Sequence, residues 1–398
     1  MKLKFAKRMS YIKASEIREI LKVTEREDVI SFAGGLPAPE LFPIDEINKM
    51  NQVVLQEAGA KALQYTTTEG YYPLREWIAK RMNELLGTSF DKDNILITHG
   101  SQQGLDLSGK VFLDDGDIVL CESPTYLAAI SAFKSYGSSF IEIPTDEEGM
   151  DMATLEEVLN NTQNIKLIYV IPTFQNPTGK TWSLERRKKL AELSALYDIP
   201  VIEDNPYGEL RFEGESLPSI KSFDKVGNIL CTGSFSKIFC PGFRIGWIAG
   251  DKDIIRKYVL VKQGTDLQCN TIAQMTIAEY LKRYDIDEHI SKIVEVYRKR
   301  RDIALECIER YFPNDIKYTH PQGGLFTWIE LPENISAHDI LQKCIEQKIA
   351  FVPGGSFYPV EHKENTFRIN YSNMPEDRIM KGLQVIGEVL KEYIHQLK

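Results

Sequence analysis

The segment Ser234–Arg244 contains residue types that could do covalent chemistry together. Lys237 supplies an amine, and Ser234 and Ser236 supply hydroxyl groups close to it. Arg244 follows after a Pro-Gly turn. Hydroxyls and a guanidinium suit one phosphate dianion, and a lysine amine can form a Schiff base with an aldehyde. The segment therefore indicates a cofactor with both groups, although a lone lysine in such a loop is more often a solvated surface residue.

The elements that would position this segment follow an alternating pattern. Between about residues 95 and 250, short apolar runs alternate with longer amphipathic ones, which is typical of parallel strands joined by crossover helices. A doubly wound α/β sheet is therefore expected. The clearest strand candidates are residues 95–98, 117–121, 166–171, 200–203 and 228–232. Residues 183–197 predict a covering helix with Ser183 as N-cap and an apolar stripe of Leu184, Leu190, Leu193 and Leu196.

Polar and aromatic residues follow each of the five expected strands. In an open α/β sheet, ligands bind beyond the carboxyl ends of the strands, so these residues should meet at one edge. In chain order they are Ser101 and Gln102, Tyr126, Asn176, Asp204 with Tyr207, and Lys237. An anion site, a stacking ring, an amide, a carboxylate, a phenol and an amine at one edge are the groups that pyridoxal phosphate uses.

Each of these groups has a possible role toward that cofactor. A buried Asp204 would favour the protonated ring nitrogen that makes the ring an electron sink. Tyr207 and Asn176 could donate hydrogen bonds to the ring 3-oxygen, and Tyr126 could stack on the ring face. Ser101 and Gln102 would open a helix whose N-terminus favours phosphate. Taken singly, each of these residues is common in turns and caps, so only the joint pattern indicates the cofactor.

Six segments resemble those of fold-type I pyridoxal phosphate enzymes of the class I and II aminotransferase family, and within it the 2-aminoadipate and kynurenine aminotransferase branch. They are residues 31–43, 63–65, 100–103, 175–179, 203–204 and 234–237. The resemblance extends from about residue 8 to about residue 375. It implies a large domain with a mainly parallel doubly wound sheet and a smaller α+β domain.

The resemblance also implies a role for each matching residue. Lys237 would be the Schiff-base lysine, Asp204 the partner of the ring nitrogen, Asn176 and Tyr207 the donors to the 3-oxygen, and Tyr126 the stacking ring. The phosphate would be bound by Ser101, Gln102, Ser234, Ser236 and Arg244. Tyr65 resembles the tyrosine that reaches the phosphate of the neighbouring subunit, which implies a homodimer with shared active sites.

Substrate contacts follow from the same resemblance. Arg368 would bind the α-carboxylate, with help from the backbone near Gly35, and Asn176 and Tyr65 would lie beside the substrate. Arg18 matches an arginine on a mobile arm that contacts substrate side chains. An acidic side chain could pair with Arg18, or an aromatic one could meet an apolar wall, so the preferred donor stays open, as do the pathway, the assembly beyond a dimer and any role of Cys240.

Three parts of the chain are expected by the same analogy. Residues 1–45 form an N-terminal arm and part of the small domain, residues 46–285 form the large cofactor-binding domain, and residues 286–398 form a connecting helix and the rest of the small domain. The connecting helix should run from about Asp285 to Tyr311, where isoleucine and valine recur among charges.

The expected reaction is a ping-pong transamination. An L-amino acid would replace Lys237 on the cofactor, the freed lysine would move the proton from Cα, and a 2-oxo acid, 2-oxoglutarate by resemblance, would reverse the steps. A pyridoxal phosphate-dependent β-lyase or decarboxylase on the same scaffold is one alternative. An effector-binding regulatory protein is another, which the short segment before residue 31 does not favour.

Composition sets the remaining limits. The 398 residues carry a formal net charge of −9, which argues against nucleic acid as a partner. Six dispersed cysteines form no C-x-x-C pair, so neither a metal site nor a disulfide framework is expected, and reduced thiols fit the cytoplasm. The sequence contains neither a long apolar run nor a signal peptide pattern, so no membrane contact is expected.

Overall fold

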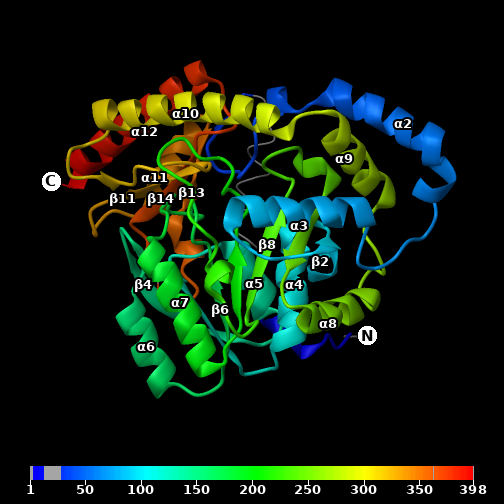
Figure 1. Cartoon of the computed structure of the whole chain (residues 1–398). Helices are drawn as coiled ribbons and strands as arrows, with labels where there is room; N and C mark the ends of the chain where they lie inside the picture. Colours follow the sequence, from blue (N-terminus) through cyan, green and yellow to red (C-terminus); the bar gives the residue numbers. More distant parts are fainter. Residues whose placement is uncertain (1–2, 13–27, 362, 398) are drawn as a thin grey trace.

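The computed structural model describes residues 3–12, 28–361 and 363–397, and its largest sheet has eight strands within these ranges (Figure 1). Their order is β2-β9-β8-β7-β6-β3-β4-β5. The strands are β2 (Ile95–Thr98), β3 (Ile118–Ser123), β4 (Ser139–Asp146), β5 (Gly149–Met150), β6 (Ile165–Val170), β7 (Val201–Asp204), β8 (Ile229–Ser234) and β9 (Gly246–Ala249).

All five strands expected from the sequence belong to this sheet. Strands β8, β7, β6, β3 and β4 pair in parallel, and β9 pairs antiparallel with both β2 and β8. Strand β2 therefore runs in the same direction as β8. The residues that follow β2, β3, β6, β7 and β8 consequently come to one edge, as the sequence predicts.

Helices cover both faces of the sheet. One face packs against α4 (Gly100–Phe112), α5 (Leu127–Lys134) and α8 (Lys252–Gln263), whose apolar residues share a core with Leu96, Ile202 and Leu230. The other face packs against α3 (Tyr72–Leu86), α6 (Met152–Asn161) and α7 (Leu184–Tyr197), and includes Ile95, Val201 and Ile229. Neighbouring residues of one strand thus face opposite layers.

Helices α7 and α10 correspond to the two helices whose positions the sequence predicts. In α7, the Ser183 hydroxyl accepts the Arg186 N–H, which confirms the N-cap. Leu190 and Leu193 are buried, but the expected stripe is wrong at Leu196, which is 69% exposed because the last turn points that side chain to solvent. Helix α10 (Ile286–Tyr311) matches the expected connecting helix, with Asp285 accepting the Asp287 N–H at 2.8 Å.

A second layer of structure packs beside the large sheet. An antiparallel sheet in the order β10-β11-β14-β13 contains β10 (Lys317–Tyr318), β11 (Phe326–Glu330), β13 (Val352–Pro353) and β14 (Thr366–Asn370). Helices α10, α11 (Ala337–Glu346) and α12 (Glu376–Leu397) pack together near it. Strand β1 (Ile30–Ser31) pairs with β12 (Ile349–Ala350), so the N-terminal segment contacts the C-terminal part. The domain boundaries at 45 and 285 stay a prediction.

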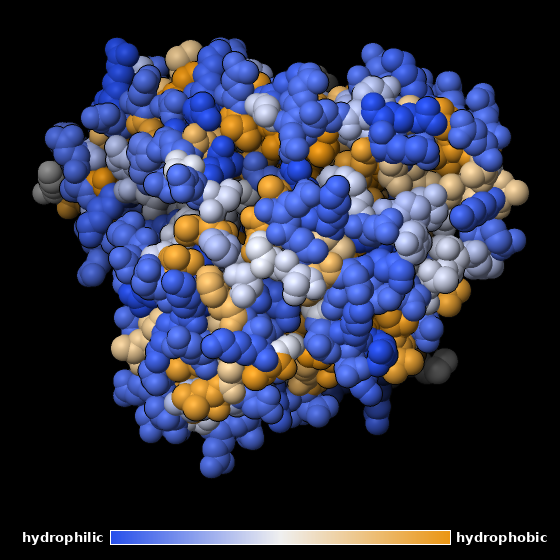
Figure 2. Space-filling model, viewed as in Figure 1, coloured by the Kyte–Doolittle hydropathy of each residue, from blue (hydrophilic) through white to orange (hydrophobic). Residues whose placement is uncertain are grey.

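The remaining elements connect these layers. Helices α2 (Ile44–Ala62) and α9 (Thr271–Arg283) pack against each other at one side of the molecule (Figure 1). The short 3-10 helices are Lys7–Ser10, Pro39–Leu41, Lys92–Asn94, Ile220–Phe223, Pro241–Phe243 and Gly354–Phe357. Over the described ranges, no helix combines the length and the hydropathy that crossing a membrane requires. The face seen in Figure 2 is mostly hydrophilic, with hydrophobic residues in separate groups.

Candidate active site

Lys237 lies in the turn that follows β8. Its half-buried ammonium donates a hydrogen bond to the Gly35 carbonyl at 2.5 Å, so it meets a segment 202 positions away in sequence. Burial, and then the positive charges of Arg368 and Arg244, lower the pKa of Lys237 to about 8. A larger share of this amine is therefore neutral near pH 7 than for an ordinary lysine, as a nucleophile or base requires.

Asp204 ends strand β7 and is 2% exposed. The Tyr169 hydroxyl donates to its Oδ2 at 2.8 Å, and the Thr232 hydroxyl donates to its Oδ1. Burial raises the pKa of Asp204, although both hydrogen bonds act against that rise. No cation among the residues that the structure describes pairs with this buried carboxyl group, so it is suited to a cationic group placed beside it.

Asn176 joins two other predicted site residues. Its Nδ2 donates to the Tyr207 hydroxyl at 3.3 Å, while its Oδ1 accepts from Arg368 Nη1 at 2.7 Å. All three side chains are buried. The Tyr207 ring meets the Phe326 ring edge to face at 5.7 Å between centroids, and burial raises the pKa of Tyr207. This amide therefore links the phenol to the guanidinium.

Arg368 lies on β14 as a buried cation. Its Nη2 donates to the Ala33 carbonyl at 2.6 Å, and its guanidinium carbon lies 4.1 Å from the Phe326 ring centroid. Nε is buried without a hydrogen-bond partner, and no carboxylate among the described residues pairs with Arg368. Burial lowers the pKa of Arg368 to about 10. An unpaired buried guanidinium is costly, and a planar carboxylate would satisfy it.

A cluster of hydroxyls and one guanidinium lies at the start of helix α4. Ser234 Oγ donates to Ser236 Oγ at 2.8 Å, and Arg244 Nη1 lies 3.5 Å from the same Ser236 oxygen. A Cβ at Gly100 would lie 2.7 Å from Arg244 Nη2, and Gly100 has a φ of 68°, so glycine lets the helix begin against the guanidinium. The cluster suits a phosphate.

The other residues predicted to contact phosphate and ring lie close to this cluster. A Cβ at Gly246 would lie 2.8 Å from the Ser101 nitrogen, so strand β9 touches the start of α4. Gln102 Nε2 donates to the Ala128 carbonyl at 3.2 Å and thereby joins α4 to α5. Tyr126 occupies the N-cap position of α5. Burial and the negative charge of Asp204 raise the pKa of Tyr126.

One predicted residue is not brought into this cluster, and for another the structure gives no position. Tyr65 is 78% exposed in the connection between α2 and α3, and its backbone N–H donates to Gln64 Oε1 at 2.8 Å. Arg18 lies outside the described residues. Conversely, sequence reasoning missed Thr232 and Tyr169, the two donors to Asp204, although a tyrosine in the mostly apolar strand β6 was a signal.

Comparison with known proteins agrees with this arrangement. The family model described as aminotransferase class I and II matches residues 27–386. An aromatic-amino-acid aminotransferase from Thermococcus litoralis is 46% identical over 392 residues, which cover 98% of this chain and 94% of that protein.

Two solved structures are similar over almost the whole chain. The kynurenine aminotransferase of Pyrococcus horikoshii, in complex with PMP, has a TM-score of 0.94 and 44% identity, covering 98% of this chain and 97% of that one. The α-aminoadipate aminotransferase of Thermus thermophilus, complexed with N-(5'-phosphopyridoxyl)-L-leucine, has a TM-score of 0.91 and 39% identity, covering 98% of both chains. The chain therefore belongs to the class I and II aminotransferase family.

Proposed function

We propose that this aminotransferase uses pyridoxal 5'-phosphate to move an amino group from an L-amino acid to a 2-oxo acid, and that the residues described above perform the reaction. The observation that carries the assignment is the buried chain of contacts from Arg368 through Asn176 to Tyr207. It supports the proposal because a buried guanidinium that could receive a carboxylate is connected to an amide and a phenol that could donate hydrogen bonds.

The described residues fit the cofactor. Asp204 would lie at the ring nitrogen, and Asn176 and Tyr207 would donate to the 3-oxygen. Tyr126 would cover the ring face. The phosphate would be held by Ser101, Gln102, Ser234, Ser236 and Arg244. When bound, pyridoxal phosphate supplies an aldehyde carbon that joins amines and an electron-withdrawing ring that stabilises negative charge at the substrate Cα.

Lys237 has two tasks in this proposal. Its amine would hold the cofactor until a substrate amine took its place. The freed Nζ would take the proton from the substrate Cα and deliver it to the carbon that had been the cofactor's aldehyde, and it would move a proton the opposite way in the second half-reaction. A pKa near 8 permits both directions at neutral pH.

Arg368 orients the substrate. Its guanidinium would bind the α-carboxylate in a bidentate manner, with Asn176 fixing one edge of the guanidinium. The backbone at Gly35 would lie near the same carboxylate, because Arg368 Nη2 donates to the carbonyl of Ala33 in the same segment. Holding the carboxylate fixes which bond of Cα faces the lysine, and turning the Cα–H bond toward it favours proton transfer over decarboxylation. β-Elimination begins with the same proton removal, so the products separate it from transamination.

Both acidic and aromatic amino acids are proposed as donors, with 2-oxoglutarate as the acceptor. The named relatives act on aromatic amino acids, kynurenine and α-aminoadipate. Arg18, outside the described residues, would contact the side chain of the substrate. A panel of amino donors with 2-oxoglutarate tests this, with glutamate formation as the readout; failure of both donor classes would refute the proposed specificity.

Formation of pyridoxamine phosphate separates transamination from the alternatives. In a single half-reaction without acceptor, a transaminase converts one cofactor per active site to the pyridoxamine form and releases a 2-oxo acid. A β-lyase instead releases ammonia from the amino donor, and a decarboxylase releases carbon dioxide. Either product in place of stoichiometric pyridoxamine phosphate would contradict the proposal.

The proposed assembly is a homodimer with shared active sites. Exposure of Tyr65 and of nearby apolar side chains supports it, since large exposed apolar groups mark interfaces. Those apolar residues are Leu36, Ile44, Leu55, Leu63 and Tyr72. A cytoplasmic location is also proposed, because all six cysteines are free and buried.

A further inference from the structure

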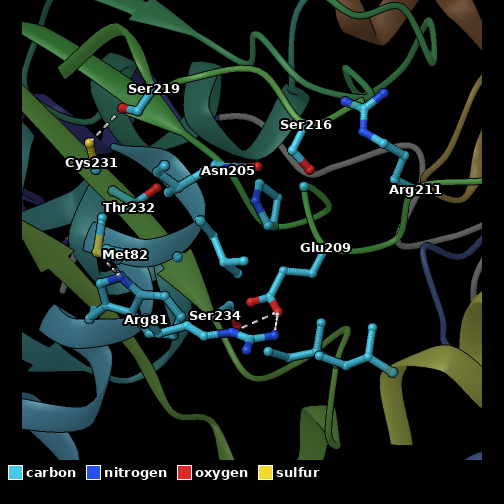
Figure 3. Close-up of a pocket in the computed structure, with 18 of the residues that line it drawn as sticks. Arg81, Met82, Asn205, Glu209, Arg211, Ser216, Ser219, Cys231, Thr232 and Ser234 are labelled. Carbon is cyan, nitrogen blue, oxygen red and sulfur yellow. Dashed lines mark hydrogen bonds and ion pairs between the residues drawn. The ribbon is translucent and has the colours of Figure 1, made fainter. Parts of the chain in front are cut away.

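A cavity of about 330 Å³ lies between strands β7 and β8 and helices α3 and α10 (Figure 3). Neither Lys237 nor Asp204 lines it. Most of its wall is apolar, and the volume is at the lower end of the range for small-molecule sites. The apolar side chains that line it include Met82, Leu86, Ile238, Trp247, Ile290 and Val294.

The cavity is on the opposite face of the sheet from the active site. Asp204 and Thr232 hydrogen-bond to each other on the face covered by α4. Glu203 and Cys231, the residues immediately before them, point to the other face, where Glu203 accepts from the Ser219 hydroxyl. Since adjacent strand residues alternate between faces, the Asp204 and Glu203 side chains lie on opposite faces of the sheet. Thr232 and Ser234 line the cavity as well, so the two sites meet at strand β8.

One carboxylate oxygen in the cavity wall has no donor. Arg81 Nε and Nη2 donate to Glu209 Oε2 at 3.2 and 2.6 Å, and Figure 3 shows the two side chains extended toward each other. Within the described part of the chain, no group donates to Glu209 Oε1. Arg81 is also bound by Asp287. Arg211 also lines the cavity and pairs with no carboxylate among the described residues, but Figure 3 shows it on the side away from Met82. The apolar end near Met82 therefore offers a hydrogen-bond acceptor and no free cation.

We propose that this cavity binds an uncharged, compact aromatic molecule with one N–H donor, of the size and chemistry of indole. The N–H would donate to Glu209 Oε1, and the ring would lie among Met82, Trp247 and Ile290. An aromatic ring suits the thioether and the indole of this wall. A charged ligand would lose its hydration to apolar side chains, and an anion would also meet Glu209.

Such a ligand would touch the turn that carries Tyr207. Asn205, Pro206, Gly208 and Glu209 line the cavity, whereas Tyr207 points to the active site and accepts from Asn176. A ligand bound in the cavity would therefore shift the position of Tyr207 and change the rate of transamination. This site goes beyond the proposed transamination, which does not depend on it.

The test is calorimetric titration of the cofactor-loaded enzyme with indole, in the presence of saturating glutamate and 2-oxoglutarate, which together keep the active site occupied without net turnover. We expect one site per chain, with a Kd of about 1 mM or below. Benzofuran, which has oxygen in place of the N–H group, should bind about tenfold more weakly. Equal affinity for the two probes would overturn the assignment of Glu209 as acceptor.

Two variants locate the bound probe. Val294→Trp from α10 and Leu85→Trp from α3 fill the cavity from different walls and should abolish indole binding. Glu295→Trp, the neighbouring exposed position of α10, is the matched control and should bind indole like the wild type. All three should transaminate normally without indole, and saturating indole should change the turnover only of the wild type and Glu295→Trp. Unaltered indole affinity in both filled variants would overturn the cavity as the site, and unaltered wild-type turnover would overturn the link to Tyr207.

Discussion

Arg368 Nη1 and Asn176 Oδ1 lie 2.7 Å apart, although 192 positions separate the two residues in sequence. The opposite side of the same amide, Nδ2, contacts the Tyr207 hydroxyl at 3.3 Å. The amide orientation that satisfies Arg368 is thus the one that leaves a donor for the phenol. One side chain therefore aligns the proposed carboxylate receptor with the proposed donor pair at the ring.

Replacing Asn176 with alanine should weaken both the binding of the substrate carboxylate by Arg368 and the hydrogen bonding to the cofactor ring. The variant loses a hydrogen bond to a charged group, which typically contributes about 1.5 to 3 kcal/mol, so we expect a loss of roughly ten- to a hundredfold in kcat/KM. Steady-state kinetics with varied amino donor measures this loss. Asn161→Ala, an exposed position in α6, serves as the control, and an Asn176 variant with the same kcat/KM as that control would contradict the link.

Replacing Lys237 with alanine should abolish turnover and covalent attachment. Borohydride reduction of the loaded wild type should add the cofactor mass permanently to the peptide containing Lys237, whereas the alanine variant should release the cofactor on denaturation. Mass spectrometry measures the adduct independently of activity. Lys252→Ala removes an exposed lysine and should behave like the wild type. An adduct in the Lys237 variant would show that another amine is the attachment point.

The sequence predicts well which residues meet at the edge of the sheet, because the alternating pattern implies parallel strands whose carboxyl ends lie together. Asp204 and Lys237 follow β7 and β8 as expected, since a parallel neighbour leaves little freedom for where a strand ends. Strand β9 could not be predicted in this way. Nothing in Gly246–Ala249 encodes that this strand runs antiparallel between β2 and β8.

Contacts made over long sequence distances were the least predictable part of the site. Arg368 lies on a short strand like many others, and only the resemblance distinguished it. Its position depends on packing between Phe326 and Phe357, whose ring centroids lie 4.1 and 5.1 Å from the guanidinium carbon. The exposed Leu196 shows a second limit of prediction from sequence. The helical period gives the spacing of an apolar stripe, but it does not show at which turn the helix leaves the core.

Glu122 should make the stability of the protein fall as the pH rises. Its carboxylate is buried and accepts from the Ile171 N–H at 2.9 Å and the Trp182 indole N–H at 2.8 Å. Burial raises the pKa of Glu122 from 4.5 to about 7, so the folded state holds a proton that the unfolded state releases. The resulting stabilisation is greatest below pH 4.5 and is lost as the pH rises to about 7, a change on the order of 3 kcal/mol.

Glu122→Gln should remove that pH dependence while losing one of the two accepted hydrogen bonds. The free energy of unfolding in urea is measured for both proteins at pH 5 and pH 8, at fixed protein concentration. At pH 5 the variant should be less stable than the wild type, and at pH 8 its free energy of unfolding should approach or exceed that of the wild type. Glu147→Gln changes an exposed carboxylate and is the control. A difference between wild type and Glu122→Gln that is the same at both pH values would refute a shifted pKa at Glu122.

Tyr65 should act in the active site of the partner subunit, because its side chain is exposed in this chain. Tyr65→Ala and Lys237→Ala homodimers should each lose most or all activity, the former through weaker phosphate binding. Hybrids between the two variants should recover activity. In a hybrid dimer, the subunit with an intact Lys237 would receive an intact Tyr65 from the other subunit, so one of its two sites would be complete.

Mixing the two variants, unfolding them together and refolding the mixture allows subunits to exchange, and the cofactor is then added. Random pairing makes half of the dimers hybrids, and each hybrid has one working site, so about a quarter of the wild-type specific activity should return. Mixing without exchange should recover none. If Tyr65 instead acted within its own chain, every site with Lys237 would still lack its tyrosine, and the refolded mixture would stay at the level of the separate variants.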